Sequence, residues 1–100
     1  MRELVFIAEA FDDLRSARRW YEERRAGLGA AFERAVEAAL ERVRRMPQSG
    51  AEVAPPFRRM IVRRFPYDVY FEFDERRILV VLLFHNSRDP AVALSRLGKH

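Results

Sequence analysis

An uninterrupted apolar run over residues 78–84 constrains the fold of this chain more than any other feature. The run follows Arg76 and Arg77 and ends at His85. Side chains alternate between the two faces of a strand, so a strand that is apolar at every position must be covered on both faces. We therefore predict a central strand over residues 78–84, with the rest of the chain arranged around it.

Two further strands precede this run. Residues 57–65 place four arginines on both faces of the first: Arg58, Arg59, Arg63 and Arg64. The second, residues 67–73, has Val69, Phe71 and Phe73 on one side, which is the alternation of a half-buried strand. Its polar side comprises Asp68, Tyr70, Glu72 and Asp74. Residues 74–77 form a polar break of hairpin length. This order predicts a basic antiparallel meander of three strands.

The first half of the chain has helical periodicity after one short strand. Residues 3–8 are apolar on both sides, which predicts a strand in the interior of the sheet. From Glu9 the period becomes that of a helix, and Gly27 is its natural stop. A second apolar stripe with spacings of three and four runs from Leu28 to Val43, and Pro47 ends it. The short connection predicts an antiparallel helical hairpin.

The remaining segments are a loop and a short terminal helix. Residues 47–56 lack periodicity and are rich in turn residues, which predicts a loop. Residues 91–97 favour one or two helical turns before Gly98. The order is then β-α-α-β-β-β with a short C-terminal helix, an α+β fold of two layers. We expect the helical hairpin to cover one face of the sheet and the other face to stay partly open, with arginines and tyrosines on it.

Length and composition indicate a single globular domain over residues 1–100. The chain has no cysteine, and one of its two histidines is the terminal His100, so neither a thiolate nor a histidine-rich metal site is expected. No apolar run approaches the roughly 18 residues of a membrane span, and the early polar residues do not fit a signal peptide. We expect a cytoplasmic protein without cofactor, metal or membrane association.

The net charge of +4 is unevenly distributed along the chain. Residues 1–56 hold ten arginines and ten acidic residues, whereas residues 57–100 hold nine basic and five acidic residues, a difference of four. The whole excess therefore lies in the half with the predicted meander. This favours an anionic partner, either nucleic acid or an acidic protein segment. A solubility charge of ordinary size is the plainer interpretation.

His85 and the arginines of the meander are the candidates for proton transfer and for phosphate binding. Histidine exchanges protons readily near neutral pH, and His85 lies at a strand end close to Arg88. If the substrate were RNA, the proton carriers would come from four residues: His85, Tyr67, Tyr70 and Glu72. The arginines of the meander either bind phosphates or form ion pairs with acidic residues on the neighbouring strand. A structural role for His85 is favoured over a catalytic one.

Taken in order, these features resemble the RelE/ParE superfamily of type II toxin–antitoxin toxins. The N-terminal residues that carry the resemblance are Asp13-Leu14, Trp20-Tyr21-Glu22, Gly27-Leu28-Gly29 and Phe32. The C-terminal ones are Arg58 or Arg59, Phe65-Pro66-Tyr67, Tyr70, His85 and Arg88-Asp89-Pro90. The resemblance covers nearly the whole chain and implies a small basic toxin in a hetero-oligomeric complex with an acidic antitoxin.

The resemblance allows two targets. ParE-like members poison DNA gyrase, whereas RelE-like members are metal-independent endoribonucleases that cut messenger RNA in the ribosome. The RelE-like alternative assigns phosphate contacts to Arg59, Arg63 and Arg64 and places His85 and Arg88 near the scissile bond. The lysines of the RelE pattern are missing, since Lys99 is the only lysine, and this favours a ParE-like toxin. A third alternative is an inactive domain that only binds a partner.

The antitoxin is expected on apolar residues in segments too short to bury themselves. These residues are Val53, Phe57, Leu94 and Leu97. The sequence thus predicts exposed apolar surface around them in the free toxin.

Overall fold

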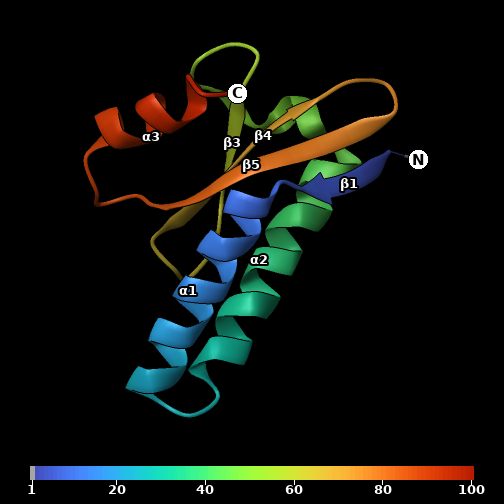
Figure 1. Cartoon of the computed structure of the whole chain (residues 1–100). Helices are drawn as coiled ribbons and strands as arrows, with labels where there is room; N and C mark the ends of the chain where they lie inside the picture. Colours follow the sequence, from blue (N-terminus) through green and yellow to red (C-terminus); the bar gives the residue numbers. More distant parts are fainter. Residues whose placement is uncertain (1) are drawn as a thin grey trace.

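The computed structural model describes residues 2–100 as one mixed sheet with two long helices and one short one (Figure 1). The elements are β1 (Glu3–Phe6), α1 (Ala8–Arg24), α2 (Leu28–Arg45), the 3-10 turn η1 (Pro47–Ser49), β2 (Ala51–Glu52), β3 (Arg58–Ile61), β4 (Tyr67–Phe73), β5 (Arg77–His85) and α3 (Pro90–Leu97). The strand order is β1-β5-β4-β3-β2. Strands β3, β4 and β5 form the predicted antiparallel meander, and β1 pairs with β5 in parallel.

The hairpin of α1 and α2 is joined by a tight glycine turn. Gly27 has a φ of 89°, which a residue without a side chain adopts most easily. The Glu22 carboxylate accepts hydrogen bonds from the N–H groups of Gly27 and Gly29, both at 3.0 Å, and thereby caps the start of α2. These two bonds lower the pKa of Glu22. A Cβ at Gly29 would lie 2.8 Å from the Arg18 carbonyl oxygen, so the glycine lets the helices approach closely.

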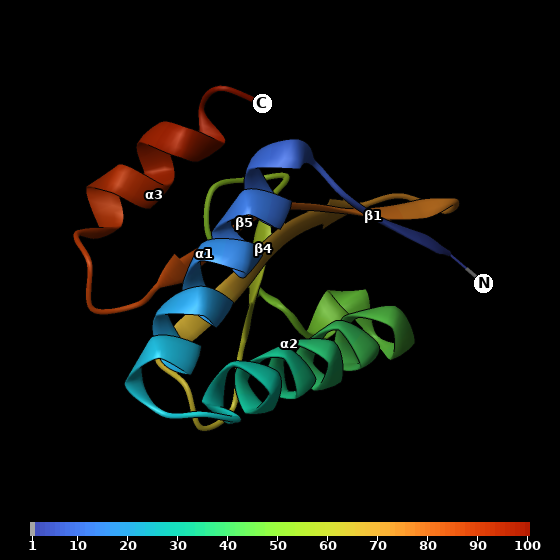
Figure 2. The ribbon, with the colours of Figure 1, turned by 60° about the horizontal axis from the view of Figure 1, so that its bottom comes forward.

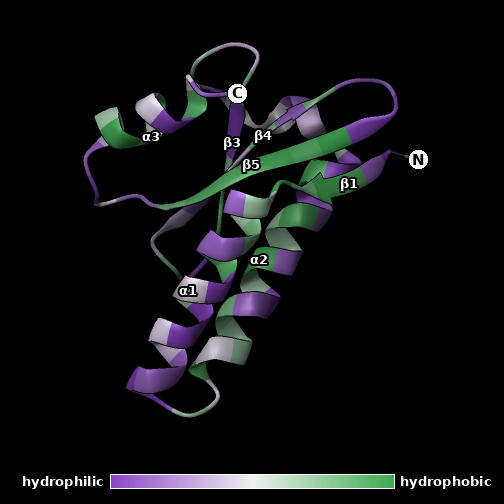
Figure 3. Cartoon of the chain, in the orientation of Figure 1, coloured by the Kyte–Doolittle hydropathy of each residue, from purple (hydrophilic) through white to green (hydrophobic). Residues whose placement is uncertain are grey.

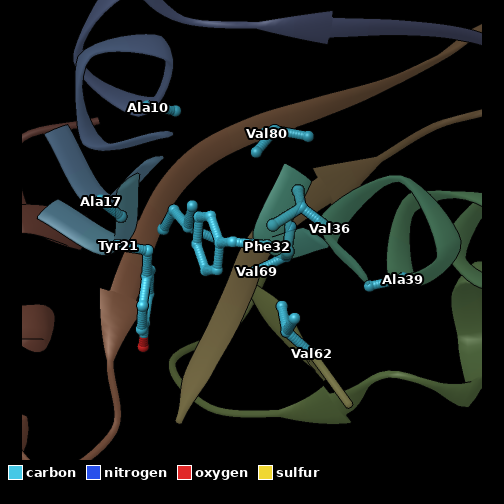
Figure 4. Packing of buried hydrophobic residues seen from close by; sticks show 10 residues of the cluster. Ala10, Ala17, Tyr21, Phe32, Val36, Ala39, Val62, Val69 and Val80 are labelled. Atoms are coloured by element: carbon cyan, nitrogen blue, oxygen red, sulfur yellow. The ribbon is translucent and has the colours of Figure 1, made fainter. Parts of the chain in front are cut away.

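The main core lies between the hairpin and the sheet. Phe32 and Val36 of α2 pack with Tyr21 of α1 and with Val69 and Val80 of the sheet (Figure 4). Phe32 stacks on Tyr21 with ring centroids 5.0 Å apart. Phe32 and Val36 belong to the apolar stripe predicted for the second helix, and each fully buried side chain of this kind contributes about 1.5–3 kcal/mol.

A second, smaller core lies on the opposite face of the sheet, where α3 packs (Figure 2). Ala93 and Leu97 of α3 cover Tyr70, Leu82 and Phe84. The expectation of an open, polar face is therefore wrong at the positions of Asp68 and Tyr70, which are 4% and 7% exposed.

The short helix α3, which covers Tyr70, is well delimited. Pro90 occupies its first turn, and the side chain of Asp89 accepts a hydrogen bond from the Ala91 N–H. The predicted C-terminal helix is thus confirmed, and it extends the coverage of the sheet beyond the two predicted layers.

Strand β5 is the central strand that its apolar run predicts, with apolar colouring along most of its length (Figure 3). It pairs with β4 on one side and with β1 on the other. The predicted interior position of the first strand is wrong, because β1 is an edge strand. Its Leu4 and Phe6 pack against the main core under the helices, which accounts for their apolar character without a second neighbouring strand.

The arginine-rich strand is shorter than predicted. The Val62 N–H donates to the Tyr67 carbonyl oxygen at 2.9 Å and closes the turn between β3 and β4. Arg63 and Arg64 therefore lie in this turn, where Arg64 has a φ of 74°. The predicted loop over residues 47–56 contains η1 and the short strand β2. Within the described residues, no helix is long and apolar enough to cross a membrane.

Candidate functional site

A cavity of about 660 Å³ lies between α1 and the end of β5. Helix α1 contributes one wall, and the end of β5 with the loop after it contributes the other. The lining residues used below are Asp13, Trp20, Tyr21, Tyr67, His85 and Arg88. His85 and Arg88, the two predicted catalytic residues, thus lie in one cavity. Sequence reasoning did not find Asp13 and Trp20 as members of the site, because their proximity to β5 arises only from the fold.

The cavity is lined by aromatic rings in edge-on contact. Tyr67 lies 6.3 Å from Tyr21 and 5.1 Å from the His85 ring, measured between centroids. Burial raises the pKa of Tyr21 and of Tyr67, so both phenols stay protonated at neutral pH. Trp20 is 49% exposed and has the Arg24 guanidinium 4.1 Å above its ring. The walls favour contact with apolar or planar groups and offer no phenolate base.

His85 is held by a local hydrogen-bonded turn. Its Nδ1 accepts from the Ser87 N–H at 3.2 Å and lies 2.7 Å from the Ser87 hydroxyl oxygen. Because Nδ1 accepts a backbone N–H, the neutral ring carries its proton on Nε2. The lone pair of Nδ1 is thus engaged within the chain, which is the structural role that the sequence favours.

An ion pair connects α1, β5 and α3 beside the cavity. One carboxylate oxygen of Asp13 accepts from Arg96 at 2.8 Å and from the Leu83 N–H at 3.1 Å. Both side chains of the pair are mostly buried, with Arg96 27% and Asp13 20% exposed. This oxygen therefore holds α3 and the edge of β5 together.

The three predicted phosphate-contacting arginines do not meet His85. Residues paired directly across two strands point to the same face of a sheet. Arg59 pairs with Tyr70, which belongs to the α3 side, whereas His85 pairs with Tyr67, which belongs to the side of the helical hairpin. Arg63 and Arg64 lie in the turn after β3. Arg88 lies over the Phe84 ring, with its guanidinium carbon 4.7 Å from the ring centroid. It lines the same cavity as His85, as the prediction requires.

The predicted exposed apolar surface is only partly present. Phe57 is 5% and Leu97 is 2% exposed, so the expectation is wrong for these two residues. They are buried because α3 folds back onto the sheet and closes the smaller core. Val53 is half-buried against the same core, and Leu94 is 50% exposed on the outer side of α3.

Comparisons with known proteins identify the fold class first. The structure is similar to a chain of the "Chromosomal ParDE TA system from P. aeruginosa", with a TM-score of 0.74 and 16% sequence identity over 85% of this chain and 96% of that chain. The architecture is therefore a ParDE-like α+β fold. No match was found among curated protein sequences.

Residues 4–90 match the family described as "ParE toxin of type II toxin-antitoxin system, parDE". The chain belongs to this family and is a ParE toxin of a type II toxin–antitoxin system. The resemblance to the RelE/ParE superfamily is thereby confirmed.

Proposed function

We propose that this toxin acts by binding DNA gyrase and stalling it, without chemistry of its own. One observation carries the proposal: the residues that a ribonuclease would need lie on different parts of the sheet. His85 faces the helical hairpin, and Arg59 lies on the α3 side. Membership of the ParE family points in the same direction, because ParE-like toxins of the superfamily act on gyrase.

Chemical requirements explain why this separation matters. Cleavage next to a ribose 2′-hydroxyl needs a base and an acid within hydrogen-bond reach, with cations around the phosphate. The Nδ1 atom of His85 is engaged by Ser87, and the phenol of Tyr67 has a raised pKa. The cavity provides one guanidinium, that of Arg88. A surface that binds protein fits this set of groups better than a nuclease site.

The test measures both candidate activities with one preparation. Purified toxin is added to a gyrase supercoiling reaction and to a translating ribosome reaction with a labelled message. We expect loss of supercoiling, accumulation of cleaved DNA bound to gyrase, and an intact message. Cleaved message with normal supercoiling would replace the proposal with the ribonuclease alternative. Activity in neither reaction would support a domain that only binds a partner.

We further propose that an acidic antitoxin, the ParD of this system, binds α3 and its surroundings in a hetero-oligomeric complex. Leu94 and Val92 expose apolar side chains on this helix, with 50% and 38% of their surface accessible. The chain as a whole has a net charge of +4, which attracts an acidic partner. We take Leu94, the more exposed of the two, as the residue on which an apolar face of the antitoxin would pack. Replacing Leu94 by Ser should weaken antitoxin binding at least tenfold, and unchanged affinity would remove this site from the proposal.

The proposed target also implies the cellular compartment in which the toxin acts. Gyrase acts on the bacterial chromosome, so the toxin must reach it in the cytoplasm.

A further inference from the structure

Three arginines from two distant segments meet at the end of α2. Arg42 and Arg45 come from the last turns of that helix, and Arg63 comes from the turn between β3 and β4. Together they line a surface hollow of about 600 Å³ in which Glu41 is the one acidic lining residue. The hollow lies apart from the cavity that contains His85, with which it shares no lining residue.

The guanidinium of Arg42 is held in place in this cluster. It donates to the Ile61 carbonyl oxygen at 2.6 Å, which fixes it at the end of β3. Burial lowers the pKa of Arg42, and the nearby charges of Arg63 and Arg45 lower it further. Arg42 thus lies close enough to Arg45 and to Arg63 for their charges to repel it, and an anion bound beside Arg42 would relieve that repulsion.

No carboxylate forms an ion pair with these arginines within the described residues. The ion pairs there are Arg18 with Glu33, Arg58 with Glu52 and Arg96 with Asp13. Arginines in the last turn of a helix stabilise its dipole, and this accounts for Arg42 and Arg45. It does not account for Arg63, which comes from another element and leaves the cluster accessible to an anion from outside the chain.

A second group of arginines on α1 provides the contrast. Arg15, Arg18 and Arg19 also surround a surface hollow, but two acidic residues, Glu22 and Glu23, line it with them. Arg18 is paired with Glu33 as well, at 3.0 Å. The α1 group is close to electrical balance, whereas the group at the end of α2 has an excess of two positive charges.

We infer that Arg42, Arg45 and Arg63 bind phosphates of the DNA backbone, in the segment of DNA that gyrase holds. The inference rests on the proposed function, which brings the toxin next to gyrase-bound DNA. Guanidinium groups match phosphates in bidentate geometry, and a backbone with closely spaced charges suits several neighbouring cations better than a single carboxylate does. Arg64, which is exposed next to Arg63 in the turn after β3, extends the positive surface.

The first experiment measures binding of a duplex oligonucleotide to the complete toxin by fluorescence anisotropy over a range of salt concentrations. The double variant Arg45→Gln, Arg63→Gln leaves Arg42 and its bond to Ile61 intact. The matched control is Arg15→Gln, Arg19→Gln, which removes the same charge from α1. We expect at least tenfold weaker binding at about 0.1 M salt and a salt slope smaller by about two in the first variant. The control should stay within about threefold of wild type.

The second experiment measures cleaved DNA trapped on gyrase, together with toxin binding to gyrase in the absence of DNA. We expect the Arg45/Arg63 variant to keep gyrase binding and to trap at least tenfold less DNA than the α1 control. If wild type and both variants trap gyrase equally and bind DNA equally, the inference is wrong and the proposed function stands.

Two other outcomes separate the inference from the proposed function. If wild type leaves gyrase unaffected, the proposed function fails, and the change in salt slope alone decides whether the three arginines bind DNA. If polyglutamate binds the wild-type cluster and duplex DNA does not, the anion is a carboxylate and the inference is overturned.

Discussion

The two faces of the sheet differ in how their cores are closed. On one face lie α1 and α2, of 17 and 18 residues, which are joined by a tight turn and share an aromatic core. On the other lies α3, of eight residues, which contributes Ala93 and Leu97 to a smaller core. Short helices derive their stability from packing. The hairpin face therefore has the larger core, and we expect the α3 face to open more easily.

Removing the central ring of the hairpin core should have the largest effect. Phe32 is fully buried and contacts Tyr21, Phe65 and Tyr67, so Phe32→Ala should cost about 3–5 kcal/mol. Leu97→Ala on the α3 face should cost about 2 kcal/mol, at the low end for such a change, because a short helix can adjust around the gap. Urea unfolding followed by circular dichroism measures both values. Equal costs would mean that the two faces are equally rigid.

The same contrast explains what the sequence could predict. Strand β5 was predicted from the apolar run of residues 78–84, and α2 from the helical stripe of residues 28–43. Both predictions succeeded because the spacing of apolar residues within an element depends on that element alone. The burial of Asp68 and Tyr70 could not be predicted in this way. For Tyr70 it depends on α3, whose first residue lies 20 positions further along the chain. A polar residue on a strand looks solvent-facing until the element that covers it is known.

The candidate site was also predicted only in part: its residues near β5 were found, and those that other elements contribute were not. His85 and Arg88 were found because His85 directly follows the apolar run and Arg88 lies three positions after His85. Trp20 and Asp13 contributed to the family resemblance but were not recognised as site residues, since their proximity to β5 requires the fold. Arg42 and Arg45 were missed for the same reason, because only the β3–β4 turn brings Arg63 to the end of α2.

The ion pair that connects the two faces should have an intermediate effect. Arg96→Ala removes the bond to Asp13 and should cost about 1–2 kcal/mol, with faster amide exchange confined to α3. Arg18→Ala breaks the pair with Glu33, in which both side chains are more than 40% exposed, and should cost less than about 1 kcal/mol. Hydrogen exchange by mass spectrometry distinguishes the two variants. Uniform exchange across the chain after Arg96→Ala would show that α3 does not open independently.

A smaller effect is expected from the buried carboxyl on the α3 side. Burial raises the pKa of Asp68 above its ordinary 3.8, against the opposing influence of Arg59 and of the Asn86 side chain, and the Oδ1 atom has no partner within the described residues. A raised pKa in the folded state means that this group stabilises the fold at low pH. The stabilisation is lost as the pH rises through its folded pKa. Asp68→Asn should therefore remove this loss and raise the melting temperature at pH 7 more than at pH 4.

Asp74, which follows the last residue of β4, provides a control of opposite sign at the other end of that strand. The N–H groups of Arg76 and Arg77 lower its pKa, so its contribution is present at neutral pH and is lost as the pH falls through its folded pKa. Asp74→Asn should lower the melting temperature at pH 7 and have little effect at low pH. Parallel pH profiles for the two variants would contradict the assignment of Asp68 as a destabilising buried charge.

The smallest effect, measured as gyrase inhibition, is expected from substitution of His85, the residue whose chemistry best suits proton transfer. His85 contributes a hydrogen bond to Ser87 and an edge contact with Tyr67 on the hairpin face. Its removal should leave the partner-binding surfaces in place, so His85→Ala should inhibit gyrase within about threefold of wild type. His85→Gln, which keeps a side-chain acceptor for Ser87, shows whether any loss comes from altered folding. A loss of 100-fold or more in both variants, with unfolding curves unchanged, would mean that the imidazole performs proton transfer and that the hairpin face carries chemistry as well as stability.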